Sequence, residues 1–314
     1  MLKQLLSKNS GRDPYVLAKA PDIEIEQSFT RDERFFEAVK ASLKVQGIYL
    51  DNSVPNSLYL DTVDYVLLRK AGVSLRHRLK GRSSGGENFT AVFGLKYLHD
   101  EFQQNSVEIL TRSSLPVLGT DNPRIRQEIE RAGDYDHKKP VNWTQLPAEI
   151  RDVIGDRLGM QKRRMKKLDF LPQFRTIANP RHQCRVQFDP KDFLAGNRVL
   201  PFNQALFYPA SSRPIEGLVC MEMAFDDCHF EFAQGVRQNS IIKLGEVEII
   251  TALSSVVDEQ LIVGDHIFRK SLRRMDENLS KTHDNYQKMQ YQPSKASLGY
   301  GQIQASASFS HLIP

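Results

Sequence analysis

The chain has 314 residues, 40% of them apolar, with a formal net charge of +5 and three cysteines. This length allows one large domain or two ordinary ones with a sizeable core, and no apolar run is long enough to cross a bilayer. The N-terminal residues lack the apolar stretch and cleavage site of a signal peptide, and the cysteines fit neither a disulfide framework nor a zinc site, so a cytoplasmic location is expected.

Hydrophobic periodicity predicts a series of strands and helices after a loose leader at residues 1–21. In the first strand Glu24 and Glu26 alternate with Ile23 and Ile25, so the acids share one face and the isoleucines share the other. The predicted strands are 22–29, 57–62, 73–80, 89–97, 105–111, 171–178, 182–188, 218–232 and 242–251. The predicted helices are 31–46, 64–71, 124–131, 148–158 and 256–278. Residues 81–86 are predicted to be a turn, since they lack the Gly-Lys-Ser/Thr ending of a phosphate-binding loop.

These strands are mostly joined by short local connections, which favours antiparallel pairing. The sequence therefore predicts an α+β fold, an eight-stranded antiparallel β-barrel with helices packed outside. This domain is expected at residues 22–280, with 189–216 as an insertion. Residues 281–314 are predicted to be a disordered tail, because they are rich in Gln, Ser, Ala and Gly and hold no acidic residue after Asp284.

One face of the predicted strands is apolar, and the other is charged. The charged set consists of Glu24, Glu26, Arg76, Arg78, Lys80, Lys96, Glu108, Arg175, Glu222, Glu246 and Glu248. Such side chains cannot form a dry core, because unpaired buried charge costs many kcal/mol. If the barrel closes, its interior is expected to be a wet, charged tunnel. His77 falls on the apolar face and is expected to be packed there.

Two Glu-x-Glu pairs, Glu24 with Glu26 and Glu246 with Glu248, lie on predicted strands near the two ends of the chain. Each pair alone could be a solvated strand face. Together, without histidine or cysteine partners, they indicate all-oxygen ligands for a hard divalent cation, Mg²⁺ or Mn²⁺.

The order and spacing of several motifs resemble the CYTH domain of the triphosphate tunnel metalloenzymes. The motifs are Ile23-Glu24-Ile25-Glu26, Tyr59-Leu60-Asp61-Thr62, Gly72-Val73-Ser74-Leu75-Arg76-His77-Arg78, Leu95-Lys96, Arg175 and Glu246-Val247-Glu248. The resemblance covers roughly residues 22–275. It implies an eight-stranded tunnel in which basic side chains hold a triphosphate and carboxylates hold one or two divalent cations.

By this resemblance, the metal ligands are expected to be Glu24, Glu26, Glu246 and Glu248. Phosphate binding is expected from Arg76, Arg78, Lys80, Lys96, Arg175 and Lys270. Glu108, Glu222 and Asp226 are further candidates that could instead orient the tunnel cations. The expected reaction is metal-dependent hydrolysis of an inorganic, nucleoside or other organic triphosphate, with water as the nucleophile and Glu24, Glu26, Arg76, Arg78 and Lys96 as catalytic residues.

The first strand departs from the family pattern, which usually reads Glu-x-Glu-x-Lys, because Ser28 stands at the lysine position. This favours an alternative, a non-catalytic module that binds a triphosphate or polyphosphate. Cyclisation of ATP, as in class IV adenylate cyclases, needs the same residues and a different nucleophile. The basic net charge leaves RNA 5′-triphosphates as a weaker substrate class, although nucleic acid is otherwise an unlikely partner and a membrane is not expected.

Overall fold

The computed structural model describes residues 22–81, 89–99, 104, 108–112, 124–136, 139–210, 215, 217–232, 244–253 and 259–310. Within this part of the chain, no helix is both long and apolar enough to span a bilayer. The predicted leader at 1–21 and most of the predicted turn at 81–86 lie outside the described residues.

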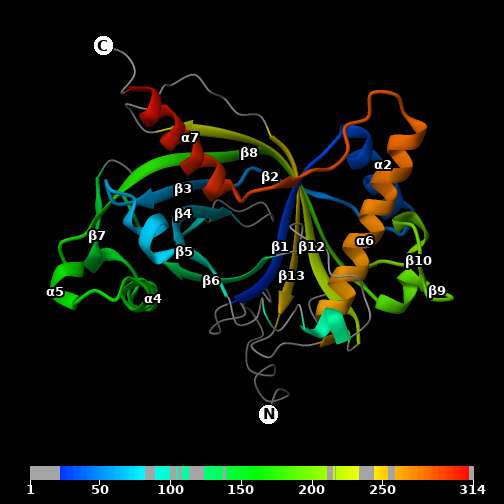
Figure 1. Cartoon of the computed structure of the whole chain (residues 1–314), viewed down its shortest axis with the longest axis horizontal. Helices are drawn as coiled ribbons and strands as arrows, with labels where there is room; N and C mark the ends of the chain where they lie inside the picture. Colours follow the sequence, from blue (N-terminus) through cyan, green and yellow to red (C-terminus); the bar gives the residue numbers. More distant parts are fainter. Residues whose placement is uncertain are drawn as a thin grey trace.

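In the described part of the chain, eight long strands form a closed antiparallel ring. They are β1 (Asp22–Thr30), β3 (Asn56–Asp61), β4 (Val73–Gly81), β5 (Phe89–Leu98), β6 (Arg124–Ala132), β8 (Asp169–Phe188), β12 (Val219–Phe232) and β13 (Leu244–Leu253). The hydrogen-bonded order is β8-β12-β13-β1-β6-β5-β4-β3, and β3 pairs in turn with β8, which closes the ring. The predicted eight-stranded antiparallel barrel is therefore confirmed (Figure 1).

Short strands and single-turn helices lie in the segments between and after the eight barrel strands. The short strands are β2 (Asp51–Ser53), β7 (Val141–Asn142), β9 (Leu194–Ala195), β10 (Arg198–Val199), β11 (Tyr208–Pro209) and β14 (Tyr291–Gln292). The single-turn helices are η1 (Leu67–Ala71), η2 (Trp143–Gln145), η3 (Pro190–Phe193) and η4 (Phe202–Gln204). The segment predicted as an insertion, 189–216, contains η3, β9, β10, η4 and β11, and its Phe193, Phe202 and Phe207 pack in the core.

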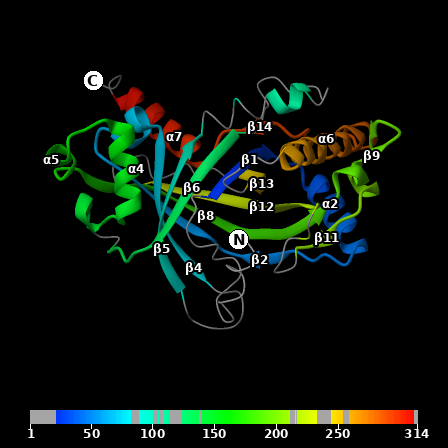
Figure 2. The same ribbon diagram turned by 90° about the horizontal axis from the view of Figure 1, so that it is seen from below.

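The helices are α2 (Glu33–Val45), α4 (Ala148–Leu158), α5 (Lys162–Met165), α6 (Glu259–Thr282) and α7 (Lys295–Ser310). Among the described residues, the helices other than α7 pack on the outside of the barrel, as predicted, whereas α7 packs against the inner face at one end of the barrel. Helices α2 and α6 cover the outer face of β8 and β12, and α4 and α5 lie on the opposite side of the molecule (Figures 1 and 2). The last helix, α7, lies beside β3 and β8, apart from α2 and α6.

Strand alternation separates the apolar outer face from the charged inner face. Ile23 and Ile25 of β1 pack with Ile262 of α6, whereas Glu26, on the other face of the strand, lines the cavity inside the barrel. His77 of β4 is buried among aromatic rings, 4.9 Å from the ring centre of Phe93, as predicted for a packed histidine. The alternation that predicted these two strands thus sets the direction of their charged side chains.

Two predicted elements are wrong. The described residues 108–112 are helical, although a strand was predicted at 105–111, and Arg124–Ala132, predicted as a helix over 124–131, is strand β6. Ile125 and Ile129 are four residues apart, a spacing typical of a helix face. In the structure both isoleucines pack in the apolar clusters outside the barrel. They share this face because residues an even number of positions apart lie on the same side of a strand. The two strands predicted at 171–178 and 182–188 are one continuous strand, β8.

The prediction of a disordered tail from residue 281 is also wrong for the described residues. Residues 291–292 form β14, which pairs with β1, and residues 295–310 form α7. Tyr300 and Ile303 of α7 are buried against Phe174 and Phe230. Small residues reduce the apolar content of this segment, and they also let the helix approach the barrel closely.

Two glycines of α7 give a matched test of this packing. A Cβ at Gly299 would overlap the ring of Phe174, whereas a Cβ at Gly301 meets nothing within 4 Å. We expect Gly299→Ala to lower the free energy of unfolding by about 1–3 kcal/mol, as overpacking does. We expect Gly301→Ala to raise it by up to about 1 kcal/mol, because alanine favours the helix. Urea denaturation of both variants measures this, and equal effects would contradict the described docking of α7.

Candidate functional site

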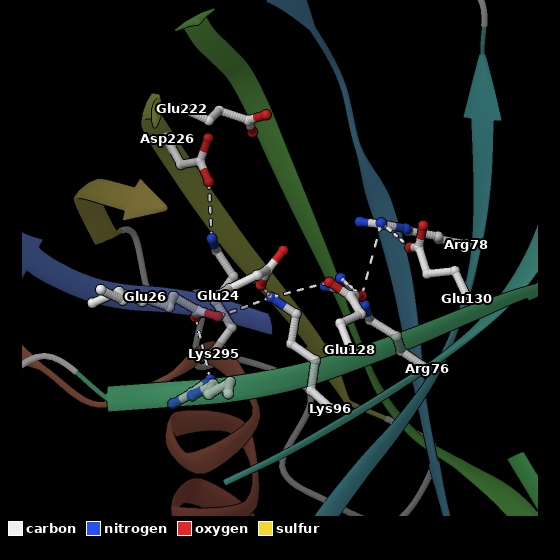
Figure 3. A network of polar contacts seen from close by, with 12 residues as sticks. Glu24, Glu26, Arg76, Arg78, Lys96, Glu128, Glu130, Glu222, Asp226 and Lys295 are labelled. Carbon is white, nitrogen blue, oxygen red and sulfur yellow. Dashed lines mark hydrogen bonds and ion pairs between the residues drawn. The ribbon is translucent and has the colours of Figure 1, made fainter. Parts of the chain in front are cut away.

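A cavity of about 590 Å³, part of it open to solvent, lies inside the barrel. Its described lining holds six cationic side chains, Arg76, Arg78, Lys96, Arg126, Arg181 and Lys295. Two carboxylates, Glu26 and Asp226, also line it. The interior of the barrel is therefore charged and mainly cationic at the cavity wall, in line with the predicted tunnel (Figure 3).

Lys96 of β5 is the centre of the first charged cluster. Its Nζ lies 3.0 Å from Glu24 Oε2 and 2.8 Å from Glu26 Oε2, both on β1. It also lies 3.3 Å from Glu128 Oε2 on β6. Three carboxylates from two strands thus converge on one ammonium group, which is only 10% exposed.

Glu128 joins Lys96 to the two arginines of β4. Its carboxylate pairs with Arg76, and Arg78 pairs with the neighbouring Glu130. Gly94 lies on β5, between β4 and β6. It leaves room for the contact of Arg76 with Glu128, because a Cβ at position 94 would lie 3.3 Å from Arg76 Cγ. Arg126 of β6, the strand that also carries Glu128, donates to Glu26 Oε1 at 3.2 Å.

Sequence reasoning missed Arg126, Glu128 and Glu130. All three belong to β6, which was expected to be a helix. The signal available in the sequence is the alternation of charged residues at 126, 128 and 130, which matches the two-residue period of a strand with a charged inner face.

The environments of Glu24 and Glu128 shift their pKa values in opposite directions. Burial raises the pKa of Glu24 to about 7, and the attraction of Lys96 only partly offsets this. Burial also disfavours ionised Glu128, but Arg76, Lys96 and Arg78 outweigh it and hold its pKa below the ordinary value. Glu128 forms ion pairs with three cations, whereas the larger effect on Glu24 is its burial, so of these two carboxyl groups Glu24 is the one with a pKa near neutral pH.

This difference predicts how stability depends on pH. Because the pKa of Glu24 is higher in the folded state than in the unfolded chain, the folded state binds more protons between about pH 4.5 and pH 7. The contribution of Glu24 to stability is therefore present at low pH and is lost as pH rises through about 7. We expect Glu24→Gln to make the free energy of unfolding less dependent on pH between these values.

The measurement is urea denaturation at closely spaced pH values in metal-free buffer. Glu37, an exposed glutamate of α2 with 56% side-chain exposure, provides the control substitution Glu37→Gln. If the free energy of unfolding changes with pH equally steeply in the wild type and in Glu24→Gln, groups other than Glu24 cause the pH dependence.

A second charged cluster surrounds Asp226 of β12. Lys295 Nζ lies 2.9 Å from Asp226 Oδ2, and Arg181 of β8 lies 3.5 Å from the same oxygen. Asp226 is fully buried, and its Oδ1 has no hydrogen-bond partner among the described residues. Glu222, another candidate from the sequence, accepts from Arg185 at 3.1 Å and contacts Arg181.

Three candidates lie away from the cavity. Arg175 is on the face of β8 opposite to the cavity-lining Thr176, and it contacts Glu231 at 4.0 Å. Glu108 is in the helical segment 108–112 and is 69% exposed, near Arg112. Lys270 lies on α6, outside the barrel, and is not part of the described cavity lining.

Strand β13 carries the second predicted acid pair. The strand register places Glu246 opposite Thr30 and Asp226, and Glu248 opposite Ser28 and Ala224. The side chains of Glu246 and Glu248 lie outside the described part of the structure, as does that of Lys80. Ser28, at the position of the lysine in the Glu-x-Glu-x-Lys pattern that the first strand resembles, is buried.

The carboxylates of the barrel provide a test of the expected metal site. Within the described residues, no three His, Cys, Asp or Glu side chains are grouped so that they could hold an ion. Glu24 and Glu26 do converge on one cation, the Lys96 ammonium, and the buried Oδ1 of Asp226 lacks a partner. Glu24 and Glu26 thus supply two carboxylates side by side, and carboxylate oxygens are the type of ligand that a hard divalent cation, Mg²⁺ or Mn²⁺, prefers.

No protein-family model and no curated protein sequence matches the chain. Among solved structures, a Hippeastrum protein described as a candidate adenylyl cyclase with a dominant triphosphatase activity is 14% identical, with a TM-score of 0.43, and the match covers 89% of this chain and 95% of that one. A candidate adenylate cyclase from Vibrio parahaemolyticus is 10% identical, with a TM-score of 0.37, over 89% of this chain and 99% of that one. The PH1819 protein of Pyrococcus horikoshii is 12% identical, with a TM-score of 0.35, over 90% and 98%. Similarities at this level carry no conclusion about activity.

Proposed function

We propose that the barrel cavity binds a triphosphate and hydrolyses it with the help of a divalent cation. The observation that carries this proposal is the convergence of six cationic side chains on one cavity inside the barrel. A triphosphate carries several negative charges on a short chain, and arginine and lysine are the side chains that bind phosphate oxygens best.

The cations of the cavity are held by carboxylates in the described state, and this arrangement supports exchange with an anionic ligand. Arg76 and Arg78 project from alternate positions of β4, so two guanidinium groups can contact neighbouring phosphates. Burial lowers the pKa of Arg78 to about 10, which still leaves it charged at neutral pH. Lys96 is held charged as well, because Glu128, Glu24 and Glu26 outweigh its burial and raise its pKa.

Glu24 and Glu26 would hold the divalent cation, with Asp226 and the predicted Glu246 and Glu248 as further oxygen donors. When bound, the ion would neutralise charge on the transferred phosphoryl group and activate the attacking water. Arg76 and Arg78 would orient the phosphates and stabilise the charge that develops on the leaving group. Glu24 must lose its proton to serve as a ligand, because only the carboxylate form binds the ion.

Release of phosphate from a panel of triphosphates, each with Mg²⁺ and with Mn²⁺, tests this proposal. The panel should include inorganic tripolyphosphate, ATP and a 5′-triphosphorylated oligonucleotide, with chromatography to distinguish hydrolysis from cyclisation of ATP. We expect phosphate release from at least one member, and its loss on chelation. No release by folded protein from any member would overturn hydrolysis.

A second candidate function is binding without turnover. Two observations favour it: Ser28 replaces the usual lysine, and Glu24 and Glu26 are already held by Lys96. In this case calorimetry would detect tight, saturable binding of tripolyphosphate while the hydrolysis assay stays blank. Turnover that disappears in Glu24→Gln would instead support hydrolysis.

A further inference from the structure

A run of basic residues forms the short helix α5 and the two positions after it. The run consists of Lys162, Arg163, Arg164, Met165, Lys166 and Lys167. Its five positive charges equal the formal net charge of the chain, +5, so the other lysines and arginines are balanced by the 38 acidic residues. The excess of positive charge therefore belongs to one short segment, which lies with α4 at one end of the molecule (Figure 1).

The backbone of this α5 run is anchored to the body of the protein. Met165 is buried in the cluster that also contains Ile154, and its sulfur lies 3.2 Å from the position that a Cβ at Gly155 would take. Directly after the run, the carbonyl of Leu168 accepts from the N–H of Trp143 at 3.2 Å. The charged side chains on both sides of Met165 are therefore displayed from a fixed backbone.

The charges of the α5 run are exposed and are not offset by carboxylates in the described structure. The basic side chains that the structure describes here are all exposed: Arg163, Arg164, Lys166 and Lys167. None of these four side chains forms a hydrogen bond or an ion pair with another described residue. By contrast, the exposed Lys40 of α2 pairs with Glu37 at 3.2 Å. Four like charges held close together without acidic partners create a positive potential that attracts an anionic partner.

The surroundings of the α5 run indicate the class of this partner. None of its described residues lines the barrel cavity, so the run is separate from the candidate triphosphate site. No exposed large hydrophobic residue of the described chain lies at 160–168, so the run lacks the apolar side chains that insert into a membrane surface. Helix α5 has four residues, which is too short to lie along a major groove and read base edges. Its contacts are therefore confined to phosphate groups.

We propose that the α5 run binds the phosphate backbone of a nucleic acid without sequence preference. Arginine and lysine bind phosphate oxygens through charge-assisted hydrogen bonds. A nucleic acid duplex carries one negative charge per about 1.7 Å of its length, so several phosphates lie within reach of one compact cluster. This second site is independent of the proposed function, and it assigns a partner that the pattern of the whole sequence did not favour.

Fluorescence anisotropy with the full chain tests the proposal. The probe is a labelled RNA of about 20 nucleotides with a 5′-hydroxyl end, so that it carries no triphosphate for the cavity. We expect saturable binding, equal for a second RNA of unrelated sequence. With four phosphate contacts, the affinity should fall about fiftyfold between about 50 and 200 mM salt. Absence of binding at the lower salt concentration, or binding to phosphatidylserine vesicles in place of RNA, would overturn the proposal.

Two variants with equal changes in net charge locate the site. In the first, glutamine replaces the described cations of the run: Arg163→Gln, Arg164→Gln, Lys166→Gln and Lys167→Gln. In the second, glutamine replaces four exposed lysines of α2, α6 and the segment after α6, on the opposite side of the molecule: Lys40→Gln, Lys44→Gln, Lys281→Gln and Lys288→Gln. We expect RNA affinity to fall at least about twentyfold in the first variant and less than about threefold in the second. Equal losses in the two variants would overturn the assignment of the site to α5.

Amine-reactive footprinting of the wild-type protein gives a readout that does not depend on the folding of a variant. Bound RNA should protect Lys166 and Lys167 from acetylation, while Lys44 and Lys281, on the opposite side, stay reactive. Unchanged reactivity of Lys166 and Lys167 at saturating RNA would contradict the proposal. Because the RNA probe has no triphosphate, each of these outcomes leaves the proposed function of the cavity unaffected.

Discussion

Glu26→Gln is expected to reduce divalent-cation-dependent hydrolysis of tripolyphosphate at least about a hundredfold. Substitution of a residue that only supports a metal ligand costs about 10–100-fold in metal affinity or activity, so loss of a ligand itself should cost at least as much. Glutamine preserves the size of the side chain and an oxygen that can accept from Lys96 and Arg126, the present partners of Glu26. The variant should therefore fold, bind the triphosphate and fail in turnover.

Glu231→Gln provides the matched control for this experiment. Glu231 also belongs to a barrel strand, β12, but it faces outward, is 59% exposed and contacts Arg175. We expect the Glu231→Gln variant to hydrolyse tripolyphosphate at the wild-type rate. Steady-state phosphate release, with circular dichroism to verify folding, compares the two variants. Similar rates for Glu26→Gln and the wild type would remove Glu26 from the reaction.

Glu128→Gln is expected to lower the free energy of unfolding by about 3–5 kcal/mol, the usual cost of removing one partner of a buried ion pair. Glu128 is 6% exposed and pairs with Arg76, Arg78 and Lys96. When the negative charge of Glu128 is removed, less negative charge remains to offset the repulsion between these three cations inside the barrel. An anionic ligand would then supply the missing negative charge.

Tripolyphosphate should therefore raise the melting temperature of Glu128→Gln more than that of the wild type. A ligand at about 100 times its Kd stabilises a protein by about 2.7 kcal/mol, and tighter binding increases this effect at the same ligand concentration. Differential scanning calorimetry with and without tripolyphosphate measures both quantities. The exposed pair of Glu37 with Lys40 gives the control Glu37→Gln, which should change stability by no more than about 0.5 kcal/mol. Equal stability of Glu128→Gln and the wild type would contradict the described role of Glu128.

The barrel and part of the charged interior could be predicted because alternation in β1 and β4 is regular. Each of these strands has apolar residues on one face and charged ones on the other, so Glu26, Arg76 and Arg78 were assigned correctly to the inside of the barrel. Strand β6 was missed because its outward isoleucines are four residues apart and its charged residues suit a helix surface equally well. In the structure, the contacts of Glu128 with Arg76 and Lys96 of the neighbouring strands show that it points into the charged interior.

The placement of Arg175 shows a second case in which the alternation of apolar and charged residues does not predict the direction of a side chain. Charged residues were assigned to the inner face of every strand, but at this end of the barrel the inner face is apolar, with Tyr59, Phe174 and Phe230 packed against α7. Arg175, the neighbour of Phe174, consequently faces outward. The contribution of α7 could not be anticipated, because a segment rich in Gly, Ser and Ala gains its stability from contacts with the barrel and not from its own apolar content.

Calorimetric titration of tripolyphosphate into the wild-type protein is the most direct test of the central claim, that the barrel cavity is a triphosphate site. We expect one ligand to bind per chain, with affinity that falls as the salt concentration rises, because the contacts are between charges. Pyrophosphate, which reaches fewer of the cavity cations, should bind at least about tenfold more weakly. Absence of saturable binding, or equal affinity for tripolyphosphate and pyrophosphate, would contradict the assignment of the cavity to a triphosphate.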